Sequence, residues 1–399
     1  MAETQPNIQY FDSPDYISNP YPLYQRLRTT DPVHHSPWGD WYLTRFDDVE
    51  MLLSDPRFCG RSPVGINPLI CSDSASSAFA RMLSKWIIFM DAPEHTRLRR
   101  LVGSYFSKQR VEGLRTEIQN IVDGLLNKIG DAGSMEVVTD LAYPLPAMVI
   151  SSILGMPDAD HLQFKDAFRQ LSRALHEGDA DVEDSATEVL TDYFQDLTAE
   201  KRRRPGEDMI SFLIDVQEAD EEFLEDHLLP TCIFLLWAGH ETTKNLLGNA
   251  VLTLLRNPQQ LHELKRNPEL IHNAVEEFLR FESPIQKICR WTSTDINIGG
   301  KVIPQGQCVV GLIGAAHRDP GRFEDPDRFD ISRNVGSHLA FGMGAHRCLG
   351  NMLARMEAQI AINSLLRRMR RLELATETVE WQESTSFRSV KSLPVTFSI

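Results

Sequence analysis

The residue types best suited to chemistry lie together in one segment, FGMGAHRCLG, at positions 341–350. Cys348 comes just before a stretch of helical periodicity that starts at Asn351. Unpaired backbone N–H groups and the positive end of the helix dipole lower the pKa of a thiol at such a position. The glycines of the segment permit tight turns and close approach of a large flat ligand, and Phe341 supplies an apolar wall. We therefore predict that Cys348 is a thiolate that serves as an axial metal ligand.

Other interpretations of this segment fit less well. A dinucleotide fingerprint would need glycine, or nearly so, where Arg347 stands, and no strand-helix-strand unit follows. A zinc site made of His338, His346 and Cys348 lacks a clear fourth ligand or an open-site geometry. Burial as a small apolar residue is the ordinary role of a cysteine without such a context, and no CxxC pair is present. We expect that role for most of the others, which are Cys59, Cys71, Cys232, Cys289 and Cys308.

A second segment, AGHETT at positions 238–243, interrupts a helical apolar run. Glycine inside a helix costs about 1 kcal/mol, so Gly239 needs a compensating role, such as leaving room for a flat ligand. Thr242 can bond back to the carbonyl four residues earlier and open a groove for dioxygen. Glu241 and Thr242 then form an acid-alcohol pair that can relay protons through water. A helix with a solvated polar patch is the alternative that these residues alone leave open.

Together these segments resemble the cytochrome P-450 superfamily. Residues 341–350 match its haem-binding pattern Phe-x-x-Gly-x-x-x-Cys-x-Gly, and residues 238–243 match Ala-Gly-x-Asp/Glu-Thr-Thr. The resemblance extends from NPYPLYQRLRTTDPV near the start to SLPVTF near the end. It implies a mainly α fold with smaller β-sheets (α+β), in which haem b lies between a long central helix and the helix after the cysteine loop. Cys348 would be the proximal ligand of the haem iron.

The resemblance also implies roles for residues outside the two segments. Cations must face the haem carboxylates, and His95, Arg99, Arg290 and His346 stand at the matching positions. The full implied set of haem-contacting residues is His95, Arg99, Ala238, Gly239, Arg290, Phe341, Gly342, His346, Cys348 and Gly350.

A structural network is implied as well. Glu277 and Arg280 lie three residues apart on a helix, where a surface ion pair would be the ordinary interpretation. The family pattern instead joins them to Arg328, in FEDPDRF, as a buried network behind the haem loop.

The activity implied is that of a soluble bacterial-type haem-thiolate monooxygenase. It would insert one oxygen atom of dioxygen into a lipophilic small molecule by hydroxylation or epoxidation, with electrons from a ferredoxin and its reductase. A polyketide, macrolide, terpenoid or steroid of secondary metabolism is the expected substrate class. Lys287 beside the pocket is expected to extend to solvent, and pairing with an anionic group of the substrate is the alternative. A peroxide-driven haem-thiolate enzyme and a non-catalytic haem-binding or ligand-binding protein are the alternatives. The expected pocket residues are Ile88, Phe234, Ala238, Ile285, Ile288 and Phe387.

The bulk composition bounds the partners of the chain. The 399 residues include 41 Lys and Arg and 56 Asp and Glu, which gives a net charge of −15. This charge disfavours binding to nucleic acid and to anionic membranes. The first residues lack a secretory signal, and the apolar run TCIFLLWAGHETT is too short for a membrane anchor. We expect a cytoplasmic monomer. An acidic ferredoxin would need a local basic patch, for which we expect Arg97, Arg100, Lys108, Arg110 and Arg347.

Without repeats or linkers, we predict one domain over residues 1–399, with β-structure near 35–60 and 290–399 and helices elsewhere. The early part predicts a helix, a strand pair around Trp41–Thr44 and a second helix that ends at Asp55-Pro56. An irregular, mobile segment is expected at 62–78. Helices should dominate from 94 to 256, with breaks at Gly130, Gly133, Gly155 and Pro205-Gly206. A hairpin should turn at Gly299-Gly300.

Overall fold

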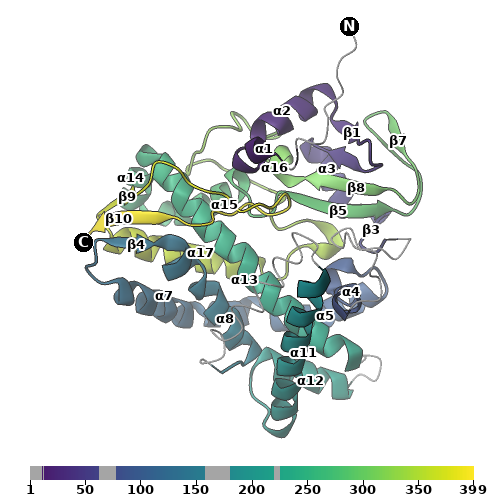
Figure 1. Cartoon of the computed structure of the whole chain (residues 1–399), viewed down its shortest axis with the longest axis horizontal. Helices are drawn as coiled ribbons and strands as arrows, with labels where there is room; N and C mark the ends of the chain where they lie inside the picture. Colours follow the sequence, from purple (N-terminus) through teal and green to yellow (C-terminus); the bar gives the residue numbers. More distant parts are fainter. Residues whose placement is uncertain (1–10, 12, 63–77, 158–179, 220–224) are drawn as a thin grey trace. The chain divides into compact units, whose positions relative to one another are not determined.

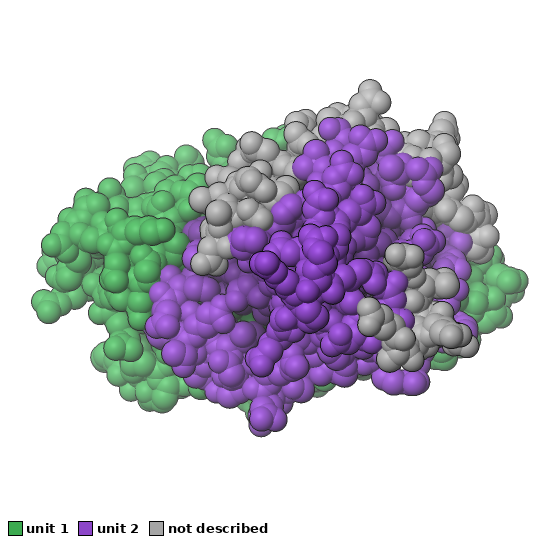
Figure 2. All heavy atoms as spheres, turned by 90° about the horizontal axis from the view of Figure 1, so that it is seen from below, with its two compact units in different colours: residues 1–59, 122–143, 242–399 green, residues 60–121, 144–241 purple. Residues whose placement is uncertain are grey.

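The computed structural model describes residues 11, 13–62, 78–157, 180–219 and 225–399 (Figure 1). Most of the irregular segment expected at 62–78 therefore lies outside the described residues. The chain forms two compact units (Figure 2). Unit 1 contains residues 1–59, 122–143 and 242–399, and unit 2 contains residues 60–121 and 144–241. Because each unit is assembled from separate stretches, neither is a contiguous segment of sequence. The single domain over residues 1–399 stays a prediction.

Helices make up most of the described chain, as the sequence predicts. Those of unit 1 are α1 (Pro14–Ser18), α2 (Tyr21–Thr30), α3 (Phe46–Ser54), the π-helical turn η3 (Val138–Ala142), α14 (Pro258–Arg266), η4 (Pro268–Leu270), α15 (Ile271–Phe281), α16 (Ile313–Ala316), η5 (Gly344–His346) and α17 (Asn351–Arg368). Those of unit 2 are α4 (Ala78–Ser84), η2 (Ile87–Phe89), α5 (Glu94–Tyr105), α6 (Lys108–Gly113), α8 (Pro144–Leu154), α11 (Ala180–Arg203) and α12 (Met209–Ala219). Two helices, α7 (Arg115–Ile129) and α13 (Glu225–Arg256), belong partly to each unit.

The described strands form three sheets, all in unit 1. The largest has the order β1-β2-β8-β5-β3, made of Val33–His35, Trp41–Leu43, Cys308–Leu312, Lys287–Thr292 and Phe58–Cys59. Within it β2 and β8 run parallel and the other pairs run antiparallel. A second sheet joins β4 (Ser134–Glu136), β10 (Pro394–Ser398) and β9 (Arg371–Leu374), and β6 (Ile296–Ile298) pairs with β7 (Lys301–Ile303). The prediction that helices fill the middle of the chain misses β4, which pairs with the distant C-terminal strand β10.

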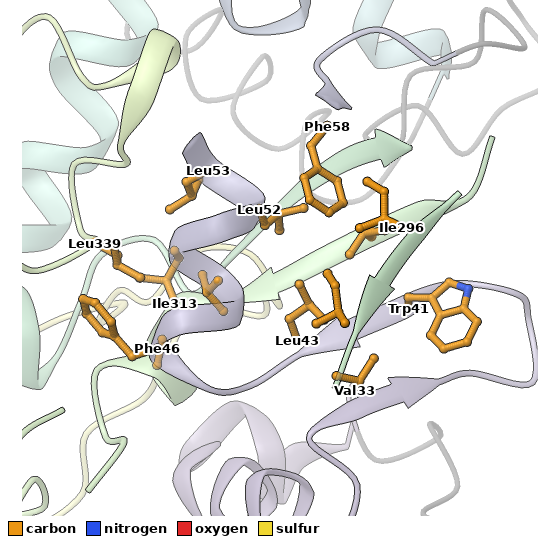
Figure 3. Close-up of a cluster of buried hydrophobic side chains, with 14 of the residues drawn as sticks. Val33, Trp41, Leu43, Phe46, Leu52, Leu53, Phe58, Ile296, Ile313 and Leu339 are labelled. Atoms are coloured by element: carbon orange, nitrogen blue, oxygen red, sulfur yellow. The ribbon is translucent and has the colours of Figure 1, made fainter. Parts of the chain in front are cut away.

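Helix α3 packs on the large sheet through one apolar face (Figure 3). Phe46, Val49, Leu52 and Leu53 are buried along it, at the spacing of a helix stripe. A Cβ atom at Gly311 of β8 would lie 2.7 Å from Cδ2 of Leu52, so glycine there permits close contact between helix and strand. This packing fixes the last turn of α3.

Several local expectations are confirmed. The chain leaves helical geometry at Gly130, Gly133 and Gly155, which have φ values of 52°, 73° and 76°, and Pro205-Gly206 separates α11 from α12. Gly299 and Gly300 turn the β6–β7 hairpin with φ values of 58° and 79°. The apolar run before residue 238 is buried in α13. Among the described residues, none of the helices has the length and apolar composition needed to cross a membrane.

Candidate functional site

The segment around Cys348 folds into a compact loop that ends at the start of α17. The backbone N–H of Cys348 donates to the carbonyl of Phe341 over 2.8 Å, which closes the loop on itself. Gly342 and Gly344 make the turns with φ values of 65° and 64°, in the left-handed region that favours glycine. Gly350 is the N-cap of α17, so Cys348 lies where the helix dipole favours a negative charge.

The same loop rests on the end of α3. A Cβ atom at Gly344 would lie 2.7 Å from the carbonyl oxygen of Leu53 and 3.0 Å from Cα of Ser54. A Cβ atom at Gly342 would have its nearest neighbour at 3.8 Å, the carbonyl oxygen of His346. Glycine is therefore required at position 344 for both conformation and space, but at position 342 for conformation alone.

The donor set of this loop fits a haem better than a zinc ion. Cys348 is exposed, unlike the buried Cys232 and Cys308. Among the described residues, no group of three His, Cys, Asp or Glu side chains could hold a metal ion. His338 instead contacts a carboxylate of Glu276 through Nε2 at 2.9 Å. A single thiolate from the protein is sufficient for a haem, because the nitrogens of the porphyrin itself also bind the iron.

Buried His317 anchors the start of the loop, and the sequence did not indicate it. Its Nε2 accepts a hydrogen bond from the backbone N–H of Leu339 over 2.9 Å. Burial lowers the pKa of His317 well below its usual value, with smaller contributions from His338 and Arg280. The imidazole is therefore neutral, as its acceptor role at Nε2 requires.

Helix α13 carries the second predicted segment. Glu241, in unit 2, is only 6% exposed, and Thr242, the first residue of unit 1 after it, is half-buried. A Cβ atom at Gly239 would lie 2.9 Å from the side chain of Ile150, so this glycine lets α8 pack closely on α13. Close packing of the two helices thus explains why glycine is needed at position 239, which was not apparent from the sequence. The contact of Gly239 with haem stays a prediction.

The four residues predicted to face the haem carboxylates are divided between the two units. His95, which is buried, and Arg99 lie on α5 of unit 2. Arg290, which is buried on β5, and His346, in η5, belong to unit 1. Nη1 of Arg290 donates to the carbonyl of Cys289 over 2.8 Å. That these four side chains converge on one ligand stays a prediction.

The predicted pocket residues divide in the same way. In unit 1 the structure brings Ile285 and Phe387 together in an antiparallel β-bridge. Ile288 packs partly against the core cluster under the large sheet. In unit 2 the ring of Phe234 lies 5.2 Å from that of Trp86, and Ile88 and Ala238 are half-buried. A pocket shared by these residues stays a prediction.

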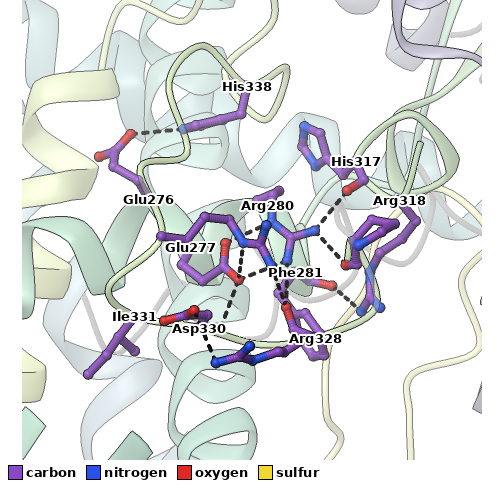
Figure 4. Close-up of polar contacts among 12 residues, drawn as sticks. Glu276, Glu277, Arg280, Phe281, His317, Arg318, Arg328, Asp330, Ile331 and His338 are labelled. Atoms are coloured by element: carbon purple, nitrogen blue, oxygen red, sulfur yellow. Dashed lines mark hydrogen bonds and ion pairs between the residues drawn. The ribbon is translucent and has the colours of Figure 1, made fainter. Parts of the chain in front are cut away.

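Glu277 and Arg280 form a fully buried ion pair on α15 (Figure 4). Nε and Nη2 of Arg280 donate to the two carboxylate oxygens of Glu277 over 2.7 and 2.8 Å. The remaining guanidinium hydrogens meet the backbone carbonyls of His317, Pro326 and Arg328 at 2.8–3.2 Å. Both charges are thus paired and hydrogen-bonded, which is the condition for burying them.

The prediction that the Arg328 side chain completes this network is wrong. That side chain is 63% exposed and pairs with Asp330 at 3.4 Å, because the turn directs the Arg328 carbonyl inward and its side chain outward (Figure 4). Arg333 takes the third place, with its side chain 13% exposed and Nε 3.3 Å from Glu277 Oε1. Its Nη2 also donates to the carbonyls of Asp325 and Arg328.

These positions make a matched pair for mutation. Arg333→Met removes a charged hydrogen bond from a buried carboxylate, so we expect the free energy of unfolding to fall by about 2 kcal/mol. Arg328→Met removes only an exposed ion pair and should change it by less than about 0.5 kcal/mol. Denaturant titration of both variants measures the difference. Equal losses would contradict the assignment of Arg333 to the network.

The two loop glycines make another pair. Gly342→Ala should cost about 1 kcal/mol, since it adds a Cβ atom in the left-handed region without a clash. Gly344→Ala should cost at least about 2 kcal/mol more, because its Cβ atom meets the backbone of α3. Thermal or denaturant unfolding compares them. A Gly344→Ala variant as stable as Gly342→Ala would show that the contact with α3 is not tight.

Comparisons with known proteins agree with this geometry. The sequence profile of the family described as Cytochrome P450 matches residues 162–394. A biotin biosynthesis cytochrome P450 of Bacillus subtilis (strain 168) is 40% identical over 397 residues, which cover 96% of this chain and 98% of the relative. The polyketide biosynthesis cytochrome P450 PksS of the same organism is 34% identical over 399 residues, with 96% and 97% covered.

A solved structure has the same fold over nearly the whole chain. It is P450BioI in complex with an acyl carrier protein ligated to hexadec-9Z-enoic acid, and it superposes with a TM-score of 0.90 at 38% identity, covering 96% of this chain and 99% of that one. The mainly α fold with small sheets is therefore confirmed as the P450 fold. The chain belongs to the cytochrome P450 family and is a haem b-binding cytochrome P450 monooxygenase.

Proposed function

We propose that Cys348 is the axial ligand of the haem, and that the enzyme inserts one oxygen atom of dioxygen into a lipophilic small molecule by hydroxylation or epoxidation. The observation that supports this most directly is the loop of residues 341–350, which presents an exposed cysteine at the N-terminus of α17. When bound there, the haem supplies dioxygen activation, with electron donation from the thiolate.

The remaining residues hold the cofactor and move protons. His95, Arg99, Arg290 and His346 are the cations that would neutralise the haem carboxylates. Phe341, Gly342 and Gly350 would line the thiolate side. Glu241 and Thr242 would form the proton relay, since the buried carboxyl of Glu241 is withdrawn from bulk solvent and Thr242 supplies a hydroxyl on the same helix.

The substrate class follows from the apolar lining expected from Ile88, Phe234, Ala238, Ile285, Ile288 and Phe387. Among the similar proteins, PksS is named for polyketide biosynthesis, and the P450BioI structure holds hexadec-9Z-enoic acid ligated to an acyl carrier protein. A lipophilic molecule such as a long-chain acyl group or a polyketide is therefore the substrate class that we propose.

The electron donor we propose is an acidic ferredoxin with its reductase. Arg100, Lys108 and Arg110 are exposed on α5 and α6 of unit 2, and Arg347 is exposed in the cysteine loop of unit 1. Such cations can steer an acidic partner despite the net charge of −15. A cytoplasmic location and a monomeric state belong to the same proposal.

Peroxide-driven catalysis is the second candidate, and Thr242→Ala separates it from the proposed reaction. Loss of the hydroxyl should lower product formation per electron pair by about 10²-fold and release hydrogen peroxide instead, since general acid catalysis contributes on that scale. Reductant consumption and peroxide release are measured with hexadec-9-enoic acid and a surrogate ferredoxin system. Thr243→Ala is the matched control, because Thr243 is buried on the same helix. Unchanged coupling in Thr242→Ala, or equal uncoupling in both variants, would contradict the relay.

A further inference from the structure

Beside the buried Glu277 pair lies a second ion cluster that the sequence did not indicate. Glu276 of α15 accepts from Nε and Nη2 of Arg355 on α17 over 2.6 and 2.9 Å. It also contacts His338 Nε2 at 2.9 Å (Figure 4). Nδ1 of His338 accepts from the N–H of Ala340, so Nε2 is the donor toward Glu276. Burial alone would raise the pKa of Glu276, but the hydrogen bonds from His338 and Arg355 lower it to about 2.

Arg355 extends from this cluster to both ends of the cysteine loop. Its guanidinium carbon lies 4.3 Å from the centre of the Phe341 ring, within the range of a cation–π contact. Its Nη1 donates to Oδ1 of Asn351 over 2.9 Å. Phe341 begins the loop, and Asn351 is the first residue of α17 after it.

The contact with Asn351 determines which way that amide faces. A guanidinium has donors only, so the amide must direct its oxygen to Arg355 and its NH₂ group away. Nδ2 of Asn351 then donates to the carbonyl of Cys348 over 2.7 Å. The N–H of Cys348 bonds to the carbonyl of Phe341. Both backbone polar groups of Cys348 therefore bond to residues that Arg355 contacts.

We propose that Arg355, held by Glu276, is a positioning residue for the thiolate of Cys348. It fixes the Asn351 amide and the Phe341 ring. Its positive charge, together with the oriented amide dipole, stabilises the thiolate and the reduced form of the site. The inference rests on the proposed function, because it takes Cys348 as the haem ligand. Loss of Arg355 should therefore favour the oxidised site and loosen the thiolate.

The first test is Arg355→Met in the holoenzyme. We expect the one-electron reduction equilibrium to shift at least threefold toward the oxidised form. The absorption band of the reduced, carbon monoxide-bound thiolate form should also decay at least fivefold faster in mild denaturant. Arg368→Met is the matched control, since Arg368 lies on the same helix and likewise pairs with a carboxylate, Asp123, and an amide oxygen, that of Asn127. Equal changes in the two variants would overturn the inference.

Asn351→Leu tests the amide without removing the cation. It should shift the reduction equilibrium in the same direction, and Arg355→Met should have a smaller effect in this background than in the wild type. Fully additive effects in the double variant would overturn the role of the amide. Unchanged values in Asn351→Leu would overturn it even if Arg355→Met did not fold. A wild-type protein without the thiolate band would instead contradict the proposed function itself.

Discussion

The proposed thiolate of Cys348 requires a fixed position at the start of α17, in a loop too short to have a core of its own. The hydrogen bond from the Cys348 N–H to the Phe341 carbonyl closes this loop, and the left-handed conformations of Gly342 and Gly344 make that closure possible. Because Gly344 touches the backbone at the end of α3, the packing of α3 on the large sheet also determines where the loop lies. Within unit 1, the cysteine loop is therefore packed against the sheet core through α3.

Paired charges on α15 connect the segments around the cysteine loop. Arg280 ties Glu277 to carbonyls of the chain between residues 317 and 328, and the neighbouring Glu276 ties α15 to α17 through Arg355. Glu277 is fully buried and Glu276 is partly buried, so their charged partners offset the cost of removing these carboxylates from water. The two adjacent glutamates of α15 therefore serve different parts of the site: one anchors the chain behind the loop, and the other reaches residues that contact Cys348.

Local patterns were sufficient to predict most elements, but they predicted neither strand β4 nor every contact. The cysteine loop, the α17 helix and the β6–β7 hairpin follow from glycine placement and periodicity, which act within a few residues. The pairing of β4 with β10 could not be predicted, since three residues gain their strand geometry from a partner far along the chain. The choice of Arg333 over Arg328 depends on which side chain a turn directs inward, and the order of residues does not reveal that.

The most direct measurement of the central claim is the absorption spectrum of the reduced, carbon monoxide-bound protein, recorded for the wild type and for Cys348→Ser. Binding of the iron by the Cys348 thiolate would give the wild type the long-wavelength band that is typical of the family, and the serine variant should lose it. A wild-type spectrum without this band, or a serine variant that keeps it, would show that the sulfur of Cys348 does not bind the iron.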